Sequence, residues 1–488
     1  MSDTSDRTML STAPGIGRRE ALVAAAGLGV TIGVTRRRAG AAGPAPRVLR
    51  AMPATVPLLG GNYPETAIWG FDGQVPGPEL RVRQGEMLRV ELRNGLPEPT
   101  TIHWHGIRLP HAMDGVPHLT QPPVPPDGTF TYSFRCEDAG TFWYHPHANS
   151  PEQLGRGLSG ALIVEEPEGV APTVDREVTW LLSDFRVGPD AGIRPDFGDV
   201  RDIAHAGRLG NAVTINGRVP QGGFAVRAGE RLRLRLINGA NARIFALAFE
   251  GHAPIVIALD GHPVPPHAPE GGRVVLGPGM RADVILDMGG TPGSRFAITD
   301  SFFPRGAYRL SELVYADAEP LRTEALPPPA MLPPNPLPEP VLDARALQAE
   351  VVLGGGMMGG LAEASLGGER LGMRDLLRRG MAWAVNGAVM AGHLHEPLFR
   401  LARGQTCVLT LQNQTAWWHP IHLHGHTFRI LSRGGVPSSH REWRDTVLLA
   451  PREDVTIAFV GDNPGRWMLH CHVLEHHAGG MGGVFAVE

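Results

Sequence analysis

GEMLRVELRN at Gly85–Asn94, GERLRLRLIN at Gly229–Asn238 and GQTCVLTLQN at Gly404–Asn413 are three copies of one ten-residue pattern. Apolar and polar residues alternate in each copy, which is typical of a half-buried β-strand. A pair of residues suited to a tight turn lies upstream of each copy: Asp72-Gly73, Asn216-Gly217 and Asn386-Gly387. The repetition predicts three β-rich units with the same local design.

The composition agrees with an all-β chain. Of 488 residues, 42% are hydrophobic and 19% charged, an ordinary balance for a globular protein. The 63 glycines and 45 prolines show no collagen-like period, so they indicate many turns. We expect units at 45–167, 173–320 and 345–488, and a proline-rich linker at 321–344 that is stiff and extended.

Charge and cysteine content exclude some classes of protein. The formal net charge is -4, with 45 basic and 49 acidic residues, which argues against a nucleic-acid partner. Three cysteines are too few for a disulfide framework. Whether Cys136 and Cys407 pair with each other stays open.

The N-terminal segment is predicted to be a twin-arginine signal peptide, residues 1–42. Arg18-Arg19 precede an apolar stretch from Ala21 to Val34, and the small residues Ala39-Gly40-Ala41 follow. The apolar stretch has roughly 14 residues, whereas about 20 are needed to span a bilayer. We therefore expect no stable membrane anchor, and a protein that is exported by the twin-arginine machinery and is periplasmic or secreted.

Histidine is concentrated in a few places. His-X-His pairs occur at 103/105, 145/147, 422/424 and 470/472. Two of the pairs follow Asn94 and Asn413 at the same spacing, where the middle unit has Leu247 and Phe249 instead. Side chains alternate along a strand, so both imidazoles of a pair face the same side. If the outer units pack together, eight imidazoles can converge on a metal cluster, for which copper, zinc, iron and nickel are all candidates.

A second constellation is more specific. Cys471 lies between His470 and His472 and faces the opposite side of the strand. His476, Met481 and His419 lie near it in the sequence. Two histidines, one cysteine and a weakly bound methionine are the ligands of a blue-copper electron-transfer site. Cys471 would thus belong to one copper site while both its neighbours face the other.

Together these motifs resemble those of the multicopper oxidases, in particular the three-domain, laccase-like bacterial type. The resemblance rests on four motifs in the family's order: His103-Trp-His105-Gly106, His145-Pro-His147, His419-Pro-Ile-His422-Leu-His424-Gly425-His426 and His470-Cys471-His472 continuing to Met481. It implies three cupredoxin-like Greek-key β-sandwich or barrel domains. The middle domain, 173–320, would carry no copper ligand.

The resemblance also implies four copper ions and their ligands. The type 1 copper would be held by His419, Cys471, His476 and Met481, and the type 2 copper by His103 and His422. The binuclear type 3 site would be held by His105, His145, His147, His424, His470 and His472. A small-molecule donor would be oxidised near the exposed edge of His419 or His476, and O2 would be reduced by four electrons to water.

Proton supply and donor identity are less determined. Asp114 matches the family's proton-relaying aspartate, although a turn residue before Gly115 is the alternative. Several bacterial relatives carry an acidic residue directly after the second type 1 histidine; this chain has His477 there, so the second relay group is open. Glu475, one position earlier, is expected to point elsewhere, and His426 to support the surrounding structure.

Phenols and aromatic amines are the favoured donors, with Cu(I) in a copper-tolerance role as the alternative and Mn(II) as a third. A group of methionines, Met357, Met358, Met373, Met381 and Met390, could bind Cu(I). However, Cu(I)-oxidising relatives carry Asp and Met just before the first type 1 histidine, where Trp417-Trp418 suggest an aromatic wall.

A nitrite reductase would need fewer His-X-His pairs, and a non-catalytic protein or copper store would not need every ligand position filled. Because one chain carries all the ligands, a monomer suffices.

Overall fold

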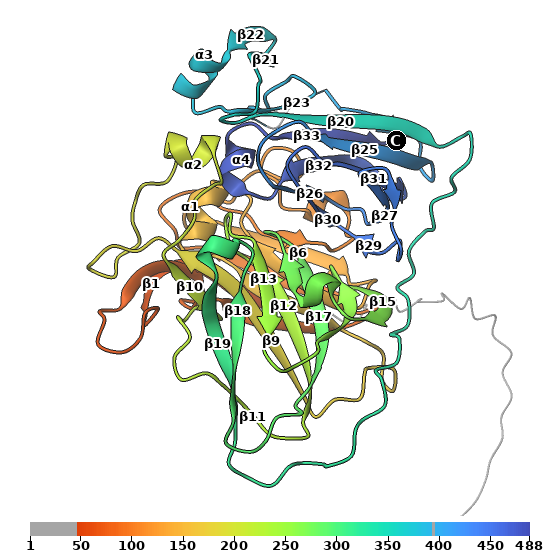
Figure 1. Ribbon diagram of the computed structural model, residues 1–488. Coiled ribbons are helices and arrows are strands. Elements are labelled where there is room, and N and C mark those ends of the chain that lie inside the picture. Colours follow the sequence, from red (N-terminus) through yellow and green to blue (C-terminus); the bar gives the residue numbers. More distant parts are fainter. Residues whose placement is uncertain (1–45, 393–395) are drawn as a thin grey trace, which may run out of the picture. The chain divides into compact units, whose positions relative to one another are not determined.

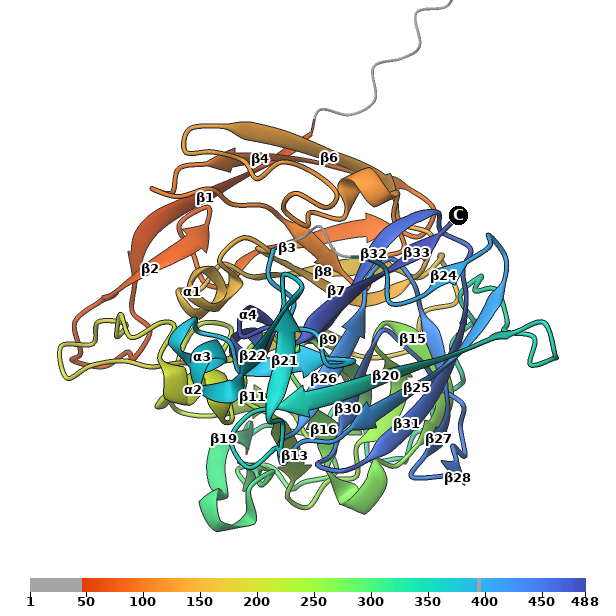
Figure 2. The same cartoon turned by 90° about the horizontal axis from the view of Figure 1, so that it is seen from above.

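The computed structural model describes residues 46–392 and 396–488. The predicted signal peptide, 1–42, lies outside the described residues. Almost all regular structure is β-strand, arranged as three pairs of sheets and one small hairpin (Figure 1 and Figure 2). The all-β prediction is therefore confirmed. Within the described ranges, the helices are all too short or too polar to cross a bilayer.

The first β-sandwich pairs a sheet of order β2-β1-β4-β6 with a sheet of order β3-β8-β7-β5. Its strands are β1 (Arg47–Val56), β2 (Thr66–Phe71), β3 (Gly77–Arg83), β4 (Met87–Asn94), β5 (His103–His105), β6 (Thr129–Arg135), β7 (Gly140–His145) and β8 (Gly160–Glu165). The short helices η1 (His111–Met113) and α1 (Ser150–Gly155) lie in its loops.

The second β-sandwich pairs a sheet of order β10-β9-β12-β17-β14-β15 with one of order β11-β19-β18-β13-β16. Its strands are β9 (Arg176–Phe185), β10 (Ala212–Ile215), β11 (Phe224–Val226), β12 (Arg231–Asn238), β13 (Phe245–Phe249), β14 (Ile255–Leu259), β15 (His262–His267), β16 (Val274–Leu276), β17 (Arg281–Asp287), β18 (Arg295–Asp300) and β19 (Tyr308–Tyr315). Its helices are α2 (Val200–Ala204), η2 (Glu270–Gly272) and η3 (Pro304–Gly306).

The third β-sandwich pairs a sheet of order β23-β20-β25-β31-β27-β28, with β29 beside β27, with a sheet of order β24-β33-β32-β26-β30. Its strands are β20 (Leu347–Gly355), β23 (Trp383–Val385), β24 (Arg400–Leu401), β25 (Thr406–Asn413), β26 (His419–Leu423), β27 (Phe428–Arg433), β28 (Val436–Pro437), β29 (Trp443–Arg444), β30 (Thr446–Leu449), β31 (Asp454–Val460), β32 (Gly465–Cys471) and β33 (Gly482–Val487). The hairpin β21 (Glu363–Leu366) and β22 (Glu369–Gly372) and the helices α3 (Met373–Arg378) and α4 (Leu474–Ala478) complete it.

The repeated asparagine has the same structural role in all three sandwiches. Asn94, Asn238 and Asn413 each end the equivalent strand, β4, β12 or β25. In each case the side-chain amide donates to two backbone carbonyls, and its oxygen accepts from the backbone N–H two residues later. One side chain thereby closes the loop that follows the strand, which explains why asparagine recurs at this position.

The predicted tight turns are also present. Asp72, Asn216 and Asn386 have φ values of 52°, 50° and 49°, and the glycine after each has φ of 71–74°. Two consecutive residues with positive φ are typical of a type I′ turn, which Asn-Gly and Asp-Gly favour.

The prediction of a half-buried strand is wrong for β12, where every residue is buried. Arg233 and Arg235 are each 1% exposed and contact Asp283 of β17. Arg235 also donates to Thr141 of the first β-sandwich. The polar face of β12 is therefore buried against a neighbouring sandwich, and the arginine charges are paired there.

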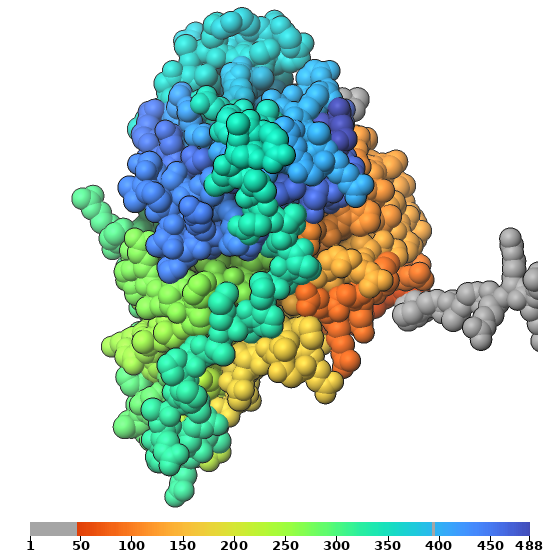
Figure 3. Space-filling view, turned by 90° about the vertical axis from the view of Figure 1, so that its right-hand side faces the viewer, coloured from red at the N-terminus to blue at the C-terminus, as the bar shows by residue number. Residues whose placement is uncertain are grey.

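Residues 316–346 contain no helix or strand and run over the outside of the second and third sandwiches (Figure 3). We call residues 321–344 of this segment the strap. Asn335 fastens the strap to the first sandwich through hydrogen bonds with both the N–H and the carbonyl of Ala139. Glu339 forms an ion pair with Arg429 of the third sandwich. The strap is thus in contact with the first and third sandwiches.

Candidate metal centres

All eight histidines of the four His-X-His pairs lie in one buried cluster between the first and third sandwiches. The register of β5 and β7 places His103 beside His145, and the register of β26 and β32 places His422 beside His470. None of the eight side chains is more than 5% exposed. The full set is His103, His105, His145, His147, His422, His424, His470 and His472.

The imidazoles of the two sandwiches alternate within the cluster. His105 stacks on His422 with ring centroids 3.8 Å apart, and His103 stacks on His424 at 4.0 Å. Three sets of three ring nitrogens lie within 4.8 Å of one another: His103 with His105 and His145, His103 with His422 and His424, and His147 with His424 and His470. Such groups of converging nitrogen donors are what a cluster of metal ions needs.

Hydrogen-bond acceptors behind the rings set their protonation. The backbone carbonyls of Asp114, Pro146, Asp445 and Cys471 accept from the Nδ1–H groups of His103, His145, His422 and His470 at 2.8–2.9 Å. A carbonyl can only accept, so in the neutral imidazole Nε2 carries the lone pair. Within the described residues, Nε2 of His103, His145 and His422 has no hydrogen-bond partner.

One pair of nitrogens makes the need for an ion explicit. His424 Nδ1 donates to Asp114, and His470 Nδ1 donates to the Cys471 carbonyl, so both Nε2 atoms carry lone pairs. These two Nε2 atoms lie only 3.1 Å apart. Two lone pairs at this separation repel each other unless a cation lies between them. The donor set therefore fits metal ions such as copper.

Burial keeps the imidazoles neutral. Desolvation, with a smaller contribution from neighbouring imidazoles, lowers the pKa of most cluster histidines below the ordinary 6.5. The affected residues are His105, His145, His422, His424, His470 and His472. These rings can therefore bind a metal at neutral pH without first losing a proton.

Asp114 is 1% exposed and contacts the cluster directly. Its Oδ2 accepts from Nδ1 of His424 at 2.9 Å, and its Oδ1 lies 3.3 Å from Nδ1 of His103. The carboxylate therefore touches one histidine from each outer sandwich. A residue that only shaped the turn before Gly115 would not need these contacts.

Sequence analysis missed a second carboxylate, Asp445, which is also 1% exposed. Its Oδ1 accepts from Nε2 of His105 at 3.1 Å, and its backbone carbonyl accepts from Nδ1 of His422 at 2.9 Å. Burial alone would raise the pKa of this carboxyl, but Arg281 and His105 together hold it well below the ordinary value. The only local signal in the sequence is an acidic residue directly before the apolar run of β30.

Arg281 connects Asp445 to all three sandwiches, a role that no sequence pattern predicted. The guanidinium donates to both oxygens of Asp445 and to the backbone carbonyls of Thr141, Gly279 and Asp260. All five of its N–H groups are therefore used. The middle sandwich carries none of the His-X-His pairs, yet it supplies the cation that fixes the carboxylate behind His105.

The predicted type 1 residues also come together. His419 Nδ1 and His476 Nδ1 lie 3.1 Å apart, and Cys471 Sγ lies 3.5 Å from the first and 3.7 Å from the second. Met481 is fully buried; its N–H donates to the His476 carbonyl and its carbonyl accepts from the Cys471 N–H. Two imidazoles and a thiol at these distances form the triangular donor set of a blue-copper site.

The outer nitrogens of this triangle are hydrogen-bonded. Nε2 of His476 donates to the His205 carbonyl at 2.7 Å, and Nε2 of His419 donates at 2.8 Å to the Thr415 hydroxyl, whose own hydrogen is donated to Asn413 Oδ1. Both Nδ1 atoms therefore present lone pairs towards Sγ. Burial lowers the pKa of His476 to about 3 and raises the pKa of the Cys471 thiol far above its ordinary value. Without a metal the buried thiol keeps its proton. A bound cation would stabilise the thiolate, so the two imidazoles and Cys471 Sγ again fit a metal ion.

Ile203, Ala204 and His205, which we call the cover, lie over the type 1 residues. Three successive carbonyls of the cover accept hydrogen bonds from the third sandwich: Ile203 from Trp383 Nε1, Ala204 from the Met357 N–H and His205 from His476. Figure 1 shows α2, which includes part of the cover, next to α4. His419 is fully buried and His476 is 1% exposed, so the expectation of an exposed imidazole edge at the type 1 site is wrong.

Other predicted residues occupy separate positions. Glu475 points away from the metal residues, as expected, and accepts from the Arg208 N–H and the Asn241 amide. His426 packs among Phe459, Trp467 and Phe485 and has a structural role. Cys136 and Cys407 are buried free thiols, which answers the open question of whether they pair.

A cavity of 490 Å³ reaches the cluster beside His147 and His477. The His477 ring lies 4.4 Å from that of His470 and 5.4 Å from that of His147. Met381 and Met390 line the same cavity, whereas Met357 lies against the cover. The methionines that are close together in the sequence therefore lie at two different sites, the cavity beside His477 and the cover.

Comparisons with known proteins identify the family. Models described as multicopper oxidase match residues 54–169, 177–315 and 373–488. A multicopper oxidase from Mycobacterium tuberculosis is 31% identical over 472 residues, covering 89% of this chain and 85% of the relative. Laccase-3 from Botryotinia fuckeliana is 26% identical over 465 residues, covering 83% of this chain and 99% of the relative.

A solved structure agrees with these matches. The multi-copper oxidase from Pseudomonas thermotolerans is 36% identical and has a TM-score of 0.78, covering 91% of this chain and 99% of that one. This likeness confirms the cupredoxin-like β-fold. The chain thus belongs to the multicopper oxidase family: it is a four-copper oxidoreductase that couples one-electron oxidation of a small-molecule or Cu(I) donor to four-electron reduction of O2 to water.

Proposed function

We propose that this chain is a laccase-type oxidase of small aromatic donors, with its copper ligands at the positions that the motifs indicate. His419, Cys471, His476 and Met481 would hold the type 1 copper, and His103 and His422 the type 2 copper. His105, His145, His147, His424, His470 and His472 would hold the type 3 pair. The facing lone pairs of His424 and His470, and of His419 and His476, are the observations that support this assignment most directly.

Copper, when bound, supplies the one-electron redox chemistry and the reduction of O2. The protein supplies a short route between the two kinds of site. Cys471 Sγ lies among the type 1 residues, while the Cys471 carbonyl accepts from Nδ1 of His470 at 2.8 Å. One residue thus contacts both centres, through its side chain and through its backbone.

Asp114 is the proposed proton relay to the cluster. Reduction of O2 to water consumes protons, so a buried group must deliver them. The Asp114 carboxylate lies within hydrogen-bonding reach of His424 and beside His103, and it can pass a proton from its oxygens towards the space between them. Asp114→Asn should lower the rate of O2 reduction without changing the rate at which donors bleach the blue band.

The aromatic surroundings of the type 1 residues favour aromatic donors. Trp417 packs edge-to-face against His205 of the cover with ring centroids 5.4 Å apart, and Trp418 is the residue directly before His419. Aromatic rings at the surface near the electron-accepting site can stack with a phenol or an aromatic amine.

Oxygen uptake by the copper-loaded protein with a simple phenol, with and without added copper ions, tests this function. Uptake without added copper, abolished in Cys471→Ser, is the expected result. Uptake that requires added copper ions would instead support the Cu(I) alternative. Met357 and Met358, which are 46% and 72% exposed beside the cover, favour that alternative and would then be the first residues to substitute.

The remaining proposals concern export and assembly. Residues 1–42 are proposed to direct export by the twin-arginine machinery to the periplasm or the medium. Replacing Arg18-Arg19 by two lysines should retain the protein in the cytoplasm.

We propose cupredoxin domains at 45–167, 173–320 and 345–488, the middle one without copper ligands. A monomer is proposed because all ligands lie on one chain, and light scattering of the loaded protein tests it.

A further inference from the structure

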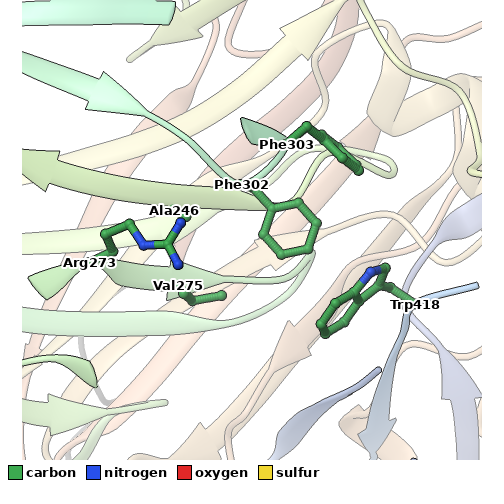
Figure 4. Close-up of a pocket in the computed structure, with 6 residues that line it drawn as sticks. All are labelled: Ala246, Arg273, Val275, Phe302, Phe303 and Trp418. Atoms are coloured by element: carbon green, nitrogen blue, oxygen red, sulfur yellow. The ribbon is translucent and has the colours of Figure 1, made fainter. Parts of the chain in front are cut away.

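A surface pocket of 290 Å³ lies where the second sandwich meets the residue before His419 (Figure 4). It is lined by Ala246, Arg273, Val275, Phe302, Phe303 and Trp418. Ala246 of β13 and Val275 of β16 are directly opposite each other in the sheet. The volume is at the lower end of the ~300–1,000 Å³ usual for small-molecule sites, so it suits one aromatic ring with a short substituent.

Aromatic side chains form much of the pocket wall. Phe302 meets Trp418 edge-to-face with ring centroids 5.2 Å apart, and it meets Phe303 in the same way at 4.8 Å. Phe303 is 47% exposed and Trp418 is half-buried, so both present ring surface to an incoming molecule. Rings arranged at steep angles to one another leave faces and edges on which a planar aromatic ligand can pack.

Arg273 adds a positive charge to this aromatic pocket (Figure 4). Its guanidinium donates to the Ser301 carbonyl at 3.2 Å, and among the described residues it forms no ion pair. The buried Asp300 carboxylate accepts through Oδ1 from the backbone N–H groups of Ala246 and Phe302 and forms no ion pair with Arg273. The exposed guanidinium is therefore available to a carboxylate, which arginine binds in a bidentate manner.

The pocket is also linked to the type 1 residues. Trp418 lines the pocket, and the next residue along the chain is His419, whose Nδ1 faces Cys471 Sγ. A ring stacked on Trp418 is thus separated from a proposed copper ligand by the indole and one peptide bond. Because the cover blocks the edge of His476, this pocket offers a donor a different approach to the type 1 centre.

We propose that this pocket binds aromatic carboxylates and is the site at which phenolic acids, such as hydroxybenzoates and hydroxycinnamates, are oxidised. The ring packs between Trp418 and the two phenylalanines, and the carboxylate pairs with Arg273. Each phenol gives one electron to the type 1 centre and its O–H proton to water, and four such oxidations supply the electrons that one O2 takes up. This inference rests on the proposed aromatic-donor function.

Binding is tested first, without turnover. Cinnamate has the ring and the carboxylate but no phenolic O–H, so its binding to the copper-loaded protein can be measured by calorimetry and ligand-observed NMR. Saturable binding that weakens about tenfold or more in Arg273→Gln, and that falls as salt rises, is the expected result. Arg305→Gln is the matched control, since Arg305 is an exposed arginine of η3 that does not line the pocket. Cinnamamide should bind weakly to the parent protein and to both variants.

Turnover then separates this inference from the proposed function. We expect Arg273→Gln to lower kcat/KM for 4-hydroxycinnamate and to leave kcat/KM for its amide unchanged. If acid and amide are oxidised equally well and Arg273→Gln changes neither, the aromatic oxidase stands and the pocket proposal is overturned. If cinnamate binds as expected but no phenol is oxidised, the oxidation step and the proposed function are both overturned, while the carboxylate site remains.

Discussion

At the scale of single residues, the orientation of each imidazole follows from what lies behind it. Four cluster histidines are held by backbone carbonyls, whereas His424 and His105 are held by the side chains of Asp114 and Asp445. A backbone carbonyl is held by the main chain on both sides, but a carboxylate position depends on its own partners. The two carboxylate-backed histidines are therefore the ones most sensitive to substitutions outside the cluster.

Arg281→Gln should disturb the cluster and spare the type 1 site. The change leaves the Asp445 carboxylate buried without its cation, which costs about 3–5 kcal/mol of unfolding free energy. Asp445 then no longer holds His105 in place, so copper per chain should fall below four while the blue band persists. Metal analysis and urea unfolding of the metal-free protein measure the two effects. Arg305→Gln should change neither, and a fully loaded Arg281→Gln protein of parent stability would contradict the role of Arg281.

The buried histidines predict an acid-labile metal-free protein. Burial lowers the pKa of His262 and of His426 to about 4, and that of the cluster rings below 6.5, so the folded state binds fewer protons than the unfolded state in acid. Unfolding free energy should thus be steady above pH 6.5 and fall steeply from there towards pH 4. Urea titrations of the metal-free protein between these values measure the slope. A flat profile over this range would show that the imidazoles are not held neutral.

At the scale of elements, the cover is held by three successive backbone carbonyls in addition to the apolar packing of Ile203 and Ala204. Hydrogen bonds from Trp383, Met357 and His476 use the carbonyls of Ile203, Ala204 and His205 in order. Because each donor is on the third sandwich, the cover can only form when the second and third sandwiches are assembled. Access to the type 1 residues therefore depends on whether the second and third sandwiches are assembled.

Trp383→Phe should loosen the cover. The substitution keeps an aromatic ring but removes the donor to the Ile203 carbonyl, and leaving a buried acceptor unpaired costs about 1–3 kcal/mol. Amide exchange of residues 200–207 should speed up about tenfold or more, and small donors should bleach the blue band faster. Trp443→Phe, in β29, is the matched control for losing an indole. Unchanged exchange in Trp383→Phe would mean that the cover is held by other contacts.

The repeated elements could be predicted from the sequence, whereas the contacts between sandwiches could not. The spacing from Asn94 and Asn413, and from Gly140 and Gly465, predicted which histidines share a strand face, and the structure brings all eight together. Arg281, Asp445 and the cover carry no periodic signal, because their partners come from other sandwiches. The same cause made the half-buried prediction for β12 wrong: alternation shows which face is polar, but only the assembled chain shows that this face is buried.

At the scale of the whole molecule, the metal residues act as an interface. Stacking of His103 on His424 and of His105 on His422 joins the first sandwich to the third. A single apolar core extends through both, and Arg281 adds a charged contact from the second. The strap adds hydrogen bonds, ion pairs and the buried side chain of Leu332, which packs against Ile257 and Ile285 of the second sandwich. The three sandwiches should therefore stay together even when the chain that links them is cut.

Cutting the strap tests this view. A protease site placed at Thr323–Ala325, which are exposed, would separate the third sandwich covalently from the other two. The nicked, copper-loaded protein should elute as one species, keep four coppers and the blue band, and unfold in a single transition. Refolding from denaturant should then depend on protein concentration, because two chains must meet before the histidines can interleave. Separation of the fragments without denaturant, or refolding at a rate independent of concentration, would show that the strap itself holds the sandwiches together.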